Sequence, residues 1–463
     1  MGDLKVSYRY SSLGFNVRVN KNSFVIVYPR QIWSSFPQKI KKEVVENFVF
    51  LATQSLPLVL QEERIDYKMS TPLFKSFFIS PLLNYLPLAG DMSRKKSFSL
   101  IKSLMNTDYC FTSSNSKNSA YELNAKDKAI ILFTFGKDSL LNYAVSKEIG
   151  LKPIPVYIEE PDIKYIDSKD ASIQNMYERV HKQTLIKKFS TKFKTQVHKI
   201  NNGLGITRYP DFFNVTTPDM GWSSQLTEYA LLTMPFNHYY KAKYLVYGNE
   251  ASCSQEYWNL DGFRVNPVFD QTKQWTLEIT KLLRLMTKNV LATSFVEPLH
   301  ELAIMKILHH RYPQYSEFQM SCFADSNSAK NSRWCHSCSK CARMFVFMKA
   351  LGIDPKTVSF NKNLFSKASK TNYSIFTSRK KDLKPYDFSG LGRDEQLFAF
   401  YLAYKNNSKG YLIDLFKKKY LDEVLDREDE FYKEFFSLHT FDTIPRRIAN
   451  KLKSVYQEEL ESL

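Results

Sequence analysis

Apolar and polar positions change period along the chain, and these changes predict an alternation of strands and helices. Residues 129–133 (AIILF) form a continuous apolar run, which is typical of a strand buried within a parallel sheet. The next segment, 139–149, repeats apolar residues at helical spacing and stops at Gly150. Further strands are expected at 154–158, 196–200 and 244–247, and further helices at 172–193, 224–240, 298–309 and 341–351. This alternation predicts a doubly wound α/β parallel sheet.

The two ends of the chain follow different patterns. Near the start, runs rich in Val, Tyr and Phe predict strands at 4–10, 15–19 and 24–28, an amphipathic helix is expected at 39–54, and 112–119 is a polar linker. Charged helical segments are expected near the end, at 395–404, 411–425 and 444–460. A chain of 463 residues exceeds what one hydrophobic core usually serves. We expect a small α+β domain over 1–120, the α/β domain over 121–358 and a helical extension over 359–463.

The net charge indicates an anionic partner but does not show which kind of anion it is. A formal charge of +18 attracts anions: nucleotides, phosphorylated or carboxylated small molecules, or nucleic acid. The basic residues form no long run, so a small anionic substrate is favoured over nucleic acid. The first residues lack a secretory signal, and the longest uncharged runs, 47–61 and 76–90, are too short and interrupted for a bilayer. We expect a soluble cytoplasmic protein with no membrane partner; a homo-oligomer is compatible with the sequence.

A short polar loop links the buried strand at 129–133 to the helix that follows it. Its residues are Thr134, Phe135, Gly136, Lys137, Asp138 and Ser139. The unpaired N–H groups and the positive dipole end of that helix favour a phosphate anion here. Gly136 lets the backbone approach a ligand, Lys137 supplies a cation, and Ser139 can donate to a phosphate oxygen. An ordinary capped turn is the alternative; we expect a phosphate-binding loop.

Four of the six cysteines lie close together in the sequence. They are Cys322, Cys335, Cys338 and Cys341. Two consecutive C-x-x-C spacings predict a tetrahedral cage of thiolates, for which zinc is the expected metal. A closed cage of four thiolates leaves no open position for catalysis, so its role should be structural. An iron–sulfur cluster is the alternative metal group, and His336 could replace one thiol as a ligand.

Two further polar groups occupy places where ligands bind. Asn249 and Glu250 directly follow the strand expected at 244–247, where they could hold Mg²⁺ or the substrate; a helix-capping turn is the alternative. Glu297, His300 and Glu301 stand at the start of the helix expected at 298–309. They suit general acid–base chemistry, but a charged helix start has the same composition.

These motifs together resemble a known superfamily. Residues 134–139 lack the Walker pattern and resemble the S-G-G-x-D-S signature of the PP-loop ATP pyrophosphatases, with Phe135 in place of the first glycine. A W-C-x-x-C-x-K-C box follows from Trp334 to Cys341. This order resembles the branch of the 7-cyano-7-deazaguanine synthases and the ATP-dependent UDP-N-acetylmuramoyl-L-alanyl-L-glutamate epimerases. Residues 248–252, 301–304 and 321–322 look closer to the epimerases, and the resemblance covers about 129–351.

The resemblance implies an adenine nucleotide alpha hydrolase-like fold and an enzyme that splits ATP into AMP and pyrophosphate. A small-molecule carboxylate would be activated as its acyl-adenylate, with Mg²⁺ spreading the charge of the phosphates. Epimerases then exchange the α-proton of an amino-acid unit, whereas the deazaguanine enzymes admit ammonia and form an amide or nitrile. The roles implied are binding of ATP by 134–139 with Asn249 and Glu250, and catalysis by Lys137, Asp138 and Ser139. A nucleic-acid-modifying protein or a non-hydrolysing scaffold of this fold are the alternatives.

Overall fold

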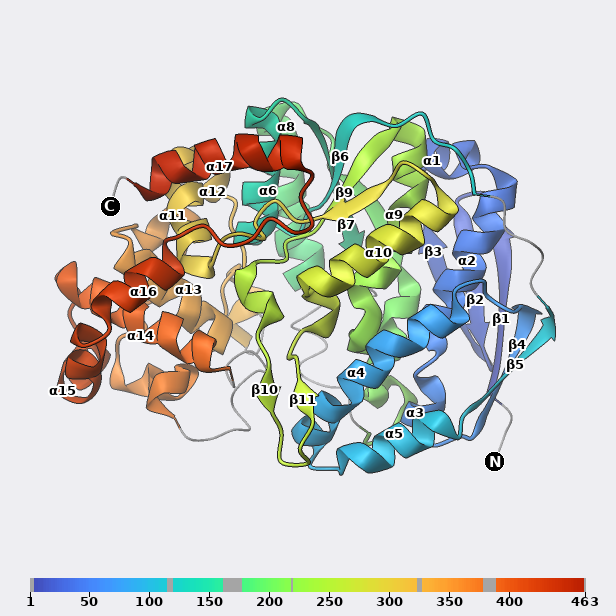
Figure 1. The fold of residues 1–463 in the computed structure, drawn as a ribbon, viewed down its shortest axis with the longest axis horizontal. Helices are drawn as coiled ribbons and strands as arrows, with labels where there is room; N and C mark the ends of the chain where they lie inside the picture. Colours follow the sequence, from blue (N-terminus) through green and yellow to red (C-terminus); the bar gives the residue numbers. More distant parts are fainter. Residues whose placement is uncertain are drawn as a thin grey trace.

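A ten-stranded sheet crosses the molecule in the computed structural model of the chain (Figure 1). The structure describes residues 4–114, 120–160, 177–217, 220–322, 327–377 and 389–461. The strands of the sheet are β1 (Leu4–Ser11), β2 (Gly14–Val19), β3 (Asn22–Val27), β4 (Arg64–Ser70), β5 (Asp108–Ser113), β6 (Lys126–Leu132), β7 (Lys152–Glu159), β8 (His198–Asn202), β9 (Ala242–Val246) and β12 (Leu291–Thr293). Their order is β12-β9-β6-β7-β8-β3-β2-β1-β4-β5. Six of the nine pairings between these described strands are parallel, so the chain is an α/β protein with a mostly parallel sheet, as predicted.

Helices cover both faces of this sheet, and others pack on those helices. They are α1 (Arg30–Ser35), α2 (Gln38–Thr53), α3 (Leu56–Leu60), α4 (Lys75–Ser93), α5 (Ser97–Met105), α6 (Lys137–Glu148), α8 (Gln183–Phe193), α9 (Gln225–Tyr240), α10 (Lys273–Met286), α11 (Glu301–Arg311), α12 (Pro313–Ser316), α13 (Ser339–Ala350), α14 (Gly390–Lys405), α15 (Tyr411–Leu425), α16 (Glu428–Phe435) and α17 (Arg446–Leu460). A π-helical turn, Tyr177–Lys182, precedes α8, and the short strands β10 (Tyr257–Trp258) and β11 (Arg264–Val265) form a separate hairpin.

The apolar run in β6 shows why both faces are covered. Successive side chains of a strand point to opposite faces. Ile131 belongs to the cluster that contains α6, α11 and α13, whereas Ile130 and Leu132 belong to the cluster that contains α2, α9 and α10. All three side chains are buried. The strand is therefore apolar on both sides because it has helices above and below it, as in a doubly wound fold.

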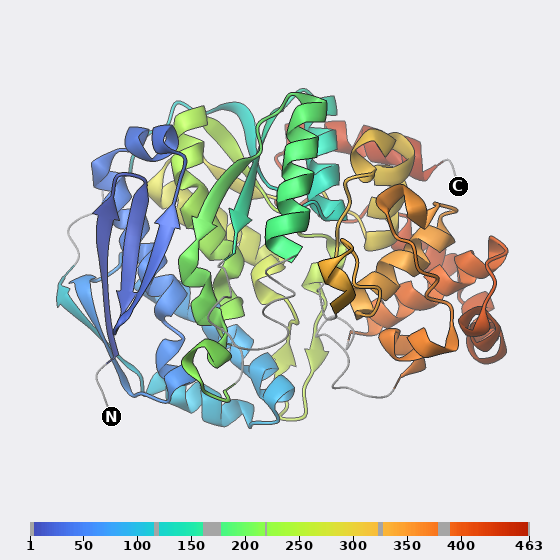
Figure 2. The same ribbon diagram turned by 180° about the vertical axis from the view of Figure 1, so that it is seen from behind.

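The N-terminal strands continue the parallel part of the sheet. β3 pairs antiparallel with β8 through Ile26 opposite Asn202 and Val27 opposite Asn201. Side chains of β1 to β3 share one hydrophobic cluster with Ile130 and Leu132 of β6. Strand pairing and apolar packing thus both cross the boundary that the sequence predicts near residue 120. Seen from behind, strands β6 to β9 lie between the N-terminal strands and the C-terminal helices (Figure 2).

Most expected elements coincide with observed ones, with a few differences. The predicted linker at 112–119 is wrong in its first two residues, because Thr112 and Ser113 belong to β5, which pairs with β4 at the edge of the sheet. Residues 115–119 lie outside the described part of the chain, as do residues 172–176 of the helix expected at 172–193. The uncharged run at 76–90 lies within α4, which contains Pro81 and Pro87. The helix α10 is not among the expected elements, although its buried residues Trp275, Ile279, Leu282 and Met286 recur at helical spacing.

One helical stretch, Gln38–Leu60, is long and apolar enough to cross a membrane by length and composition alone. Its most apolar window is 83% buried inside the molecule. The side chains of Phe48, Val49 and Phe50 in α2 lie fully within the shared core. This packing is that of a core helix in a soluble globular protein.

Candidate functional site

The loops after β6 and β9 meet where the strand order reverses. The chain runs from β6 to β7 and β8 on one side, then returns to β9 and β12 on the other side of β6. In open α/β sheets, ligands bind beyond the carboxyl ends of the strands at such a reversal. Lys137 and Asp138 begin α6, directly after the first loop, and Asn249 and Glu250 lie in the second loop. The predicted site residues therefore flank the position in the sheet that favours a ligand.

The backbone of the first loop keeps a conformation that suits glycine. Phe135 has a φ of 62°, in the left-handed region that bulky residues rarely adopt. Its ring is fully buried against Phe133 and Phe189, with ring centroids 4.7 and 5.8 Å away. Its carbonyl oxygen accepts a hydrogen bond of 2.8 Å from the N–H of Met320. Phe135 thus adopts a turn that favours glycine, and its ring is packed in the core.

Replacing Phe135 with glycine tests this balance. Relief of the left-handed conformation gains about 1–2 kcal/mol, but loss of a buried phenyl ring costs about 3–5 kcal/mol. We expect Phe135→Gly to lower the free energy of unfolding by roughly 2–3 kcal/mol, measured by urea denaturation. Lys241→Gly is the matched control, since Lys241 has a φ of 54° and an exposed side chain; it should be neutral or slightly stabilising. A stabilised Phe135→Gly protein would contradict the packing argument.

Lys137 is enclosed by carboxyl groups. Its side chain is 5% exposed, and its Nζ lies 2.6 Å from Asp138 Oδ1 and 3.3 Å from Glu250 Oε2. A third carboxylate, Glu301 of α11, has its Oε2 at 3.1 Å, and its other oxygen pairs with Arg343 of α13 at 3.0 Å. The ammonium group of Lys137 therefore joins the loop after β6, the loop after β9 and the start of α11. Its expected contact with pyrophosphate would require it to leave these partners.

Burial and neighbouring charges shift the pKa values of the groups in this network. Burial opposes a charged Lys137, but Asp138, Glu250 and Glu301 outweigh it and raise the pKa of Lys137 well above its usual value. Burial raises the pKa of Glu250 well above its usual value. At Glu301, burial is overcome by Lys137 and then by Arg343, which lower the pKa to about 2. At neutral pH, Lys137 is charged and Glu301 is its anionic partner. The Ser252 hydroxyl donates to Glu250 Oε1 at 2.9 Å.

Glu395 of α14 adds a pH dependence to this region. It accepts a hydrogen bond of 2.9 Å from the N–H of Leu302, and burial followed by the charge of Glu301 raises its pKa from 4.5 to about 8. Because the folded-state pKa is raised, the wild-type protein loses stability as pH rises from about 4.5 to about 8. Glu395→Gln keeps the acceptor and removes the titration.

We expect Glu395→Gln to match wild type near pH 5 and to become relatively more stable up to pH 8, by about 1.4 kcal/mol per pH unit at most. Urea denaturation at pH 5, 7 and 9 measures this difference. A difference that stays constant over this range would contradict the assignment of a raised pKa to Glu395.

The remaining predicted residues make local contacts. The carbonyl oxygen of Thr134 accepts a hydrogen bond from Lys182, and the Ser139 hydroxyl donates to the Gly136 carbonyl at 3.1 Å. The Asn249 amide donates to Thr276 of α10 at 3.0 Å, so it braces the second loop against a helix. The structure thus brings together Lys137, Asp138 and Glu250, with Glu301 as a partner that the sequence suggested only for acid–base chemistry.

Gly248 permits the close approach of the two loops. A Cβ at this position would lie 2.8 Å from the Cβ of Asp138, which is closer than real Cβ contacts come. The glycine therefore lets the loop after β9 pack directly on the start of α6. This approach places Glu250 within reach of Lys137.

The four predicted cysteines form one cluster. Sulfur separations are 3.6 Å between Cys322 and Cys341, 3.8 Å between Cys335 and Cys341, and 4.0 Å between Cys322 and Cys338. Four sulfurs around one zinc ion at about 2.3 Å lie about 3.8 Å apart, so the cluster could hold a metal ion such as zinc. Hydrogen bonds from the neighbouring thiols, Cys322 first, lower the pKa of Cys335. This grouping of the described residues does not include His336.

The segments that carry the four cysteines also contact the loop after β6 and the charge network. Cys338 caps α13 by accepting the N–H of Cys341 at 3.3 Å, and Trp334 is fully buried with its indole N–H donating to Val358. Just ahead of Cys322, Met320 donates to the carbonyl of Phe135. α13 also carries Arg343, the second cation beside Glu301. Binding of a metal here would hold both the loop and the charge network in place.

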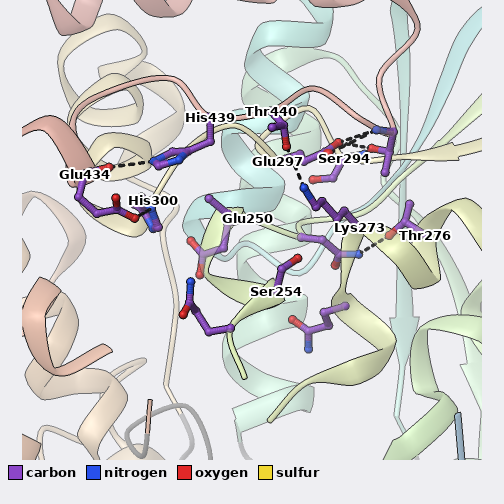
Figure 3. A pocket seen from close by; sticks show the side chains of 15 residues that line it. Glu250, Ser254, Lys273, Thr276, Ser294, Glu297, His300, Glu434, His439 and Thr440 are labelled. Carbon is purple, nitrogen blue, oxygen red and sulfur yellow. Dashed lines mark hydrogen bonds and ion pairs between the residues drawn. The ribbon is translucent and has the colours of Figure 1, made fainter. Parts of the chain in front are cut away.

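A cavity of about 170 Å³ lies beside the second loop (Figure 3). Its lining includes Asn249, Glu250, Lys273, Glu297 and His300. Glu297 accepts the N–H groups of Asp442 and Thr443 at 2.8 and 3.0 Å, so this carboxylate anchors the segment before α17. Glu297 lies in the turn before α11, which begins at Glu301 and not at the expected residue 298, and its partners are fixed.

Comparison with known proteins assigns no relative: no protein-family model matches the chain, and no curated protein matches its sequence. The function proposed below therefore depends on the geometry of the site.

Proposed function

We propose that the protein binds ATP at the loop after β6 and transfers AMP to a small-molecule carboxylate, releasing pyrophosphate. The observation that carries this proposal is the place of the two loops at the reversal of the strand order, joined through Lys137. The glycine-like turn at Phe135 and the N-terminus of α6 support it, because they leave backbone N–H groups at the position that favours a polyphosphate.

Each group of this chain has a role in the proposed reaction. The first N–H groups of α6 and its dipole would stabilise the leaving pyrophosphate as the carboxylate attacks the α-phosphorus. Asp138, whose side chain is 27% exposed, and Glu250 are the oxygen donors placed to hold Mg²⁺, which would neutralise the charge of the phosphates. Lys137 is the positioning residue that holds these two carboxyl groups together. The step that follows adenylation, epimerisation above all, depends on which carboxylate is the substrate.

Product analysis tests the proposal. Purified protein is incubated with labelled ATP, Mg²⁺ and a panel of carboxylates that includes muramoyl dipeptides and 7-carboxy-7-deazaguanine. We expect AMP and pyrophosphate in the presence of one carboxylate class. Formation of ADP, or no AMP with any carboxylate, would contradict the proposal.

Asp138→Asn separates catalysis from folding. The amide keeps the size of the side chain but removes its charge, so we expect AMP formation to fall at least about 100-fold. The exposed Asp414, far along the chain in α15, supplies the matched control Asp414→Asn, which should retain full activity. Circular dichroism and thermal unfolding check that both variants fold. An active Asp138→Asn protein would remove Asp138 from the site.

A further inference from the structure

Three potential metal ligands come together at the cavity beside the second loop. His300 stands at the N-terminal end of α11, Glu434 lies in α16, and His439 follows α16. Each offers one ligand atom, and the three atoms lie within 4.8 Å of one another. His300 Nε2 is 3.1 Å from Glu434 Oε1, and the two imidazole rings meet edge to face with centroids 4.5 Å apart (Figure 3). These residues are separate from the phosphate loop and from the four cysteines.

The hydrogen bonds of His439 identify its available nitrogen. Its Nε2 lies 2.9 Å from the main-chain oxygen of Glu434, which can only accept. Nε2 therefore carries the hydrogen, and the neutral ring keeps a lone pair on Nδ1. Histidines that bind metals are commonly oriented in this way, by donating their other N–H to a carbonyl oxygen.

His300 has an unused nitrogen in the same place. The residue is 2% exposed, and its Nδ1 is buried with no hydrogen-bond partner among the described residues. A hydrogen on Nδ1 leaves the lone pair of the neutral ring on Nε2, which lies 3.1 Å from Glu434 Oε1. A metal ion between Nε2 and this carboxylate would take the place of a proton shared by the two groups.

The charges around the cavity favour a cation. Three carboxyl groups line it, those of Glu250, Glu297 and Glu434. Lys273 is the single lysine or arginine among its described lining residues, and its ammonium group is paired with Asp442 at 2.6 Å. Two imidazoles with a carboxylate form the ligand set that zinc and related transition-metal ions prefer.

We propose that His300, Glu434 and His439 form a second metal site, which binds a divalent transition-metal ion such as Zn²⁺. Nitrogen and oxygen ligands at about 2.0–2.1 Å from one ion lie about 3.4 Å apart, so binding needs only a small contraction of the cluster. The side chain of Glu434 is 40% exposed and has room to make it. Three protein ligands leave one position of a tetrahedral ion open toward the cavity, for water or an anionic oxygen of a substrate.

Metal stoichiometry of the full chain tests this site independently of ATP chemistry. Wild-type protein is equilibrated with Zn²⁺, desalted and analysed for bound zinc. We expect one equivalent more in wild type than in Glu434→Gln and His439→Gln, which keep similar side-chain size. Asp429→Asn, an exposed acidic position in the same helix, is the control and should bind as much zinc as wild type. Equal zinc content in wild type and both Gln variants would overturn the proposal.

Cobalt absorption distinguishes this site from the cysteines. Co²⁺ is added to wild-type protein that retains the metal of the cysteine cluster. The expected spectrum has the visible bands of a nitrogen and oxygen site without the intense thiolate charge-transfer band, and Zn²⁺ abolishes it. Binding in both Gln variants should weaken at least about tenfold. A thiolate band for this equivalent, or no visible bands in wild type, would also overturn the proposal.

Discussion

Cys338→Ser is expected to release one metal ion per chain and to unfold much of the region around α13. Structural zinc contributes about 10–16 kcal/mol to the folding of small zinc domains, and loss of one thiolate removes much of that affinity. The sulfur of Cys338 also accepts the N–H of Cys341 at the start of α13. We expect the free energy of unfolding to fall by roughly 5 kcal/mol or more, with loss of soluble protein.

Cys110→Ser is the matched control for this experiment. Cys110 lies half-buried in β5, at the edge of the sheet and outside the cysteine cluster. This variant should keep its metal and lose no more than about 1 kcal/mol. Metal analysis also identifies the ion, because an iron–sulfur cluster would give iron, sulfide and visible absorption in place of zinc. A Cys338→Ser protein with full metal content would show that the four thiols do not share one ion.

Lys137→Met is expected to destabilise the protein by about 3–5 kcal/mol at neutral pH, since it leaves buried carboxylates without their cation. Glu301 is the group most affected, because Lys137 is the first of the charges that overcome its burial and hold its pKa at about 2. In the variant, burial moves that pKa upward. The ionised Glu301 then lowers the free energy of unfolding of the variant, and this loss disappears when the carboxyl group is protonated.

The sign of the pH dependence follows from this shift. In wild type, the depressed pKa of Glu301 contributes stability that is present above about pH 4.5 and is lost as pH falls toward about 2. The difference between wild type and Lys137→Met should therefore shrink as pH falls from 7 to 4.5, as measured by urea denaturation. Lys147→Met, at an exposed position of the same helix, is the control and should change stability by less than about 0.5 kcal/mol. An equally small effect of Lys137→Met would contradict the buried network.

The parts of the site that the sequence predicts are those built from neighbouring residues. The apolar run before Phe133 predicts the strand, the loop and the start of α6, because all three follow from a local change of period. The spacing from Cys335 to Cys341 predicts the cysteine cluster for the same reason. Phe135 departs from the expected glycine, yet its backbone lies in the left-handed region that glycine favours, with its ring packed against other aromatic rings.

The parts that the sequence does not predict depend on contacts between distant segments. Nothing near Lys137 indicates that Glu301 lies beside it, because α11 reaches this place only when the chain has crossed the sheet. Glu434 and His439 belong to a region with no motif. They are recognised as potential metal ligands only because the fold places them beside His300. The junction of β3 with β8 is equally hidden, since antiparallel pairing of two short strands leaves no pattern in either.

That junction bears on how the chain can be divided. Two residue pairs join β3 to β8 in the described part of the chain, yet removal of the first three strands would leave the backbone of β8 unpaired on that side and uncover apolar side chains such as Ile200. Unprotected strand edges of this kind recruit other chains and promote aggregation. A recombinant fragment that starts at the α/β region would therefore expose an unpaired, aggregation-prone strand edge at β8. The N-terminal strands protect the rest of the protein by pairing with this edge.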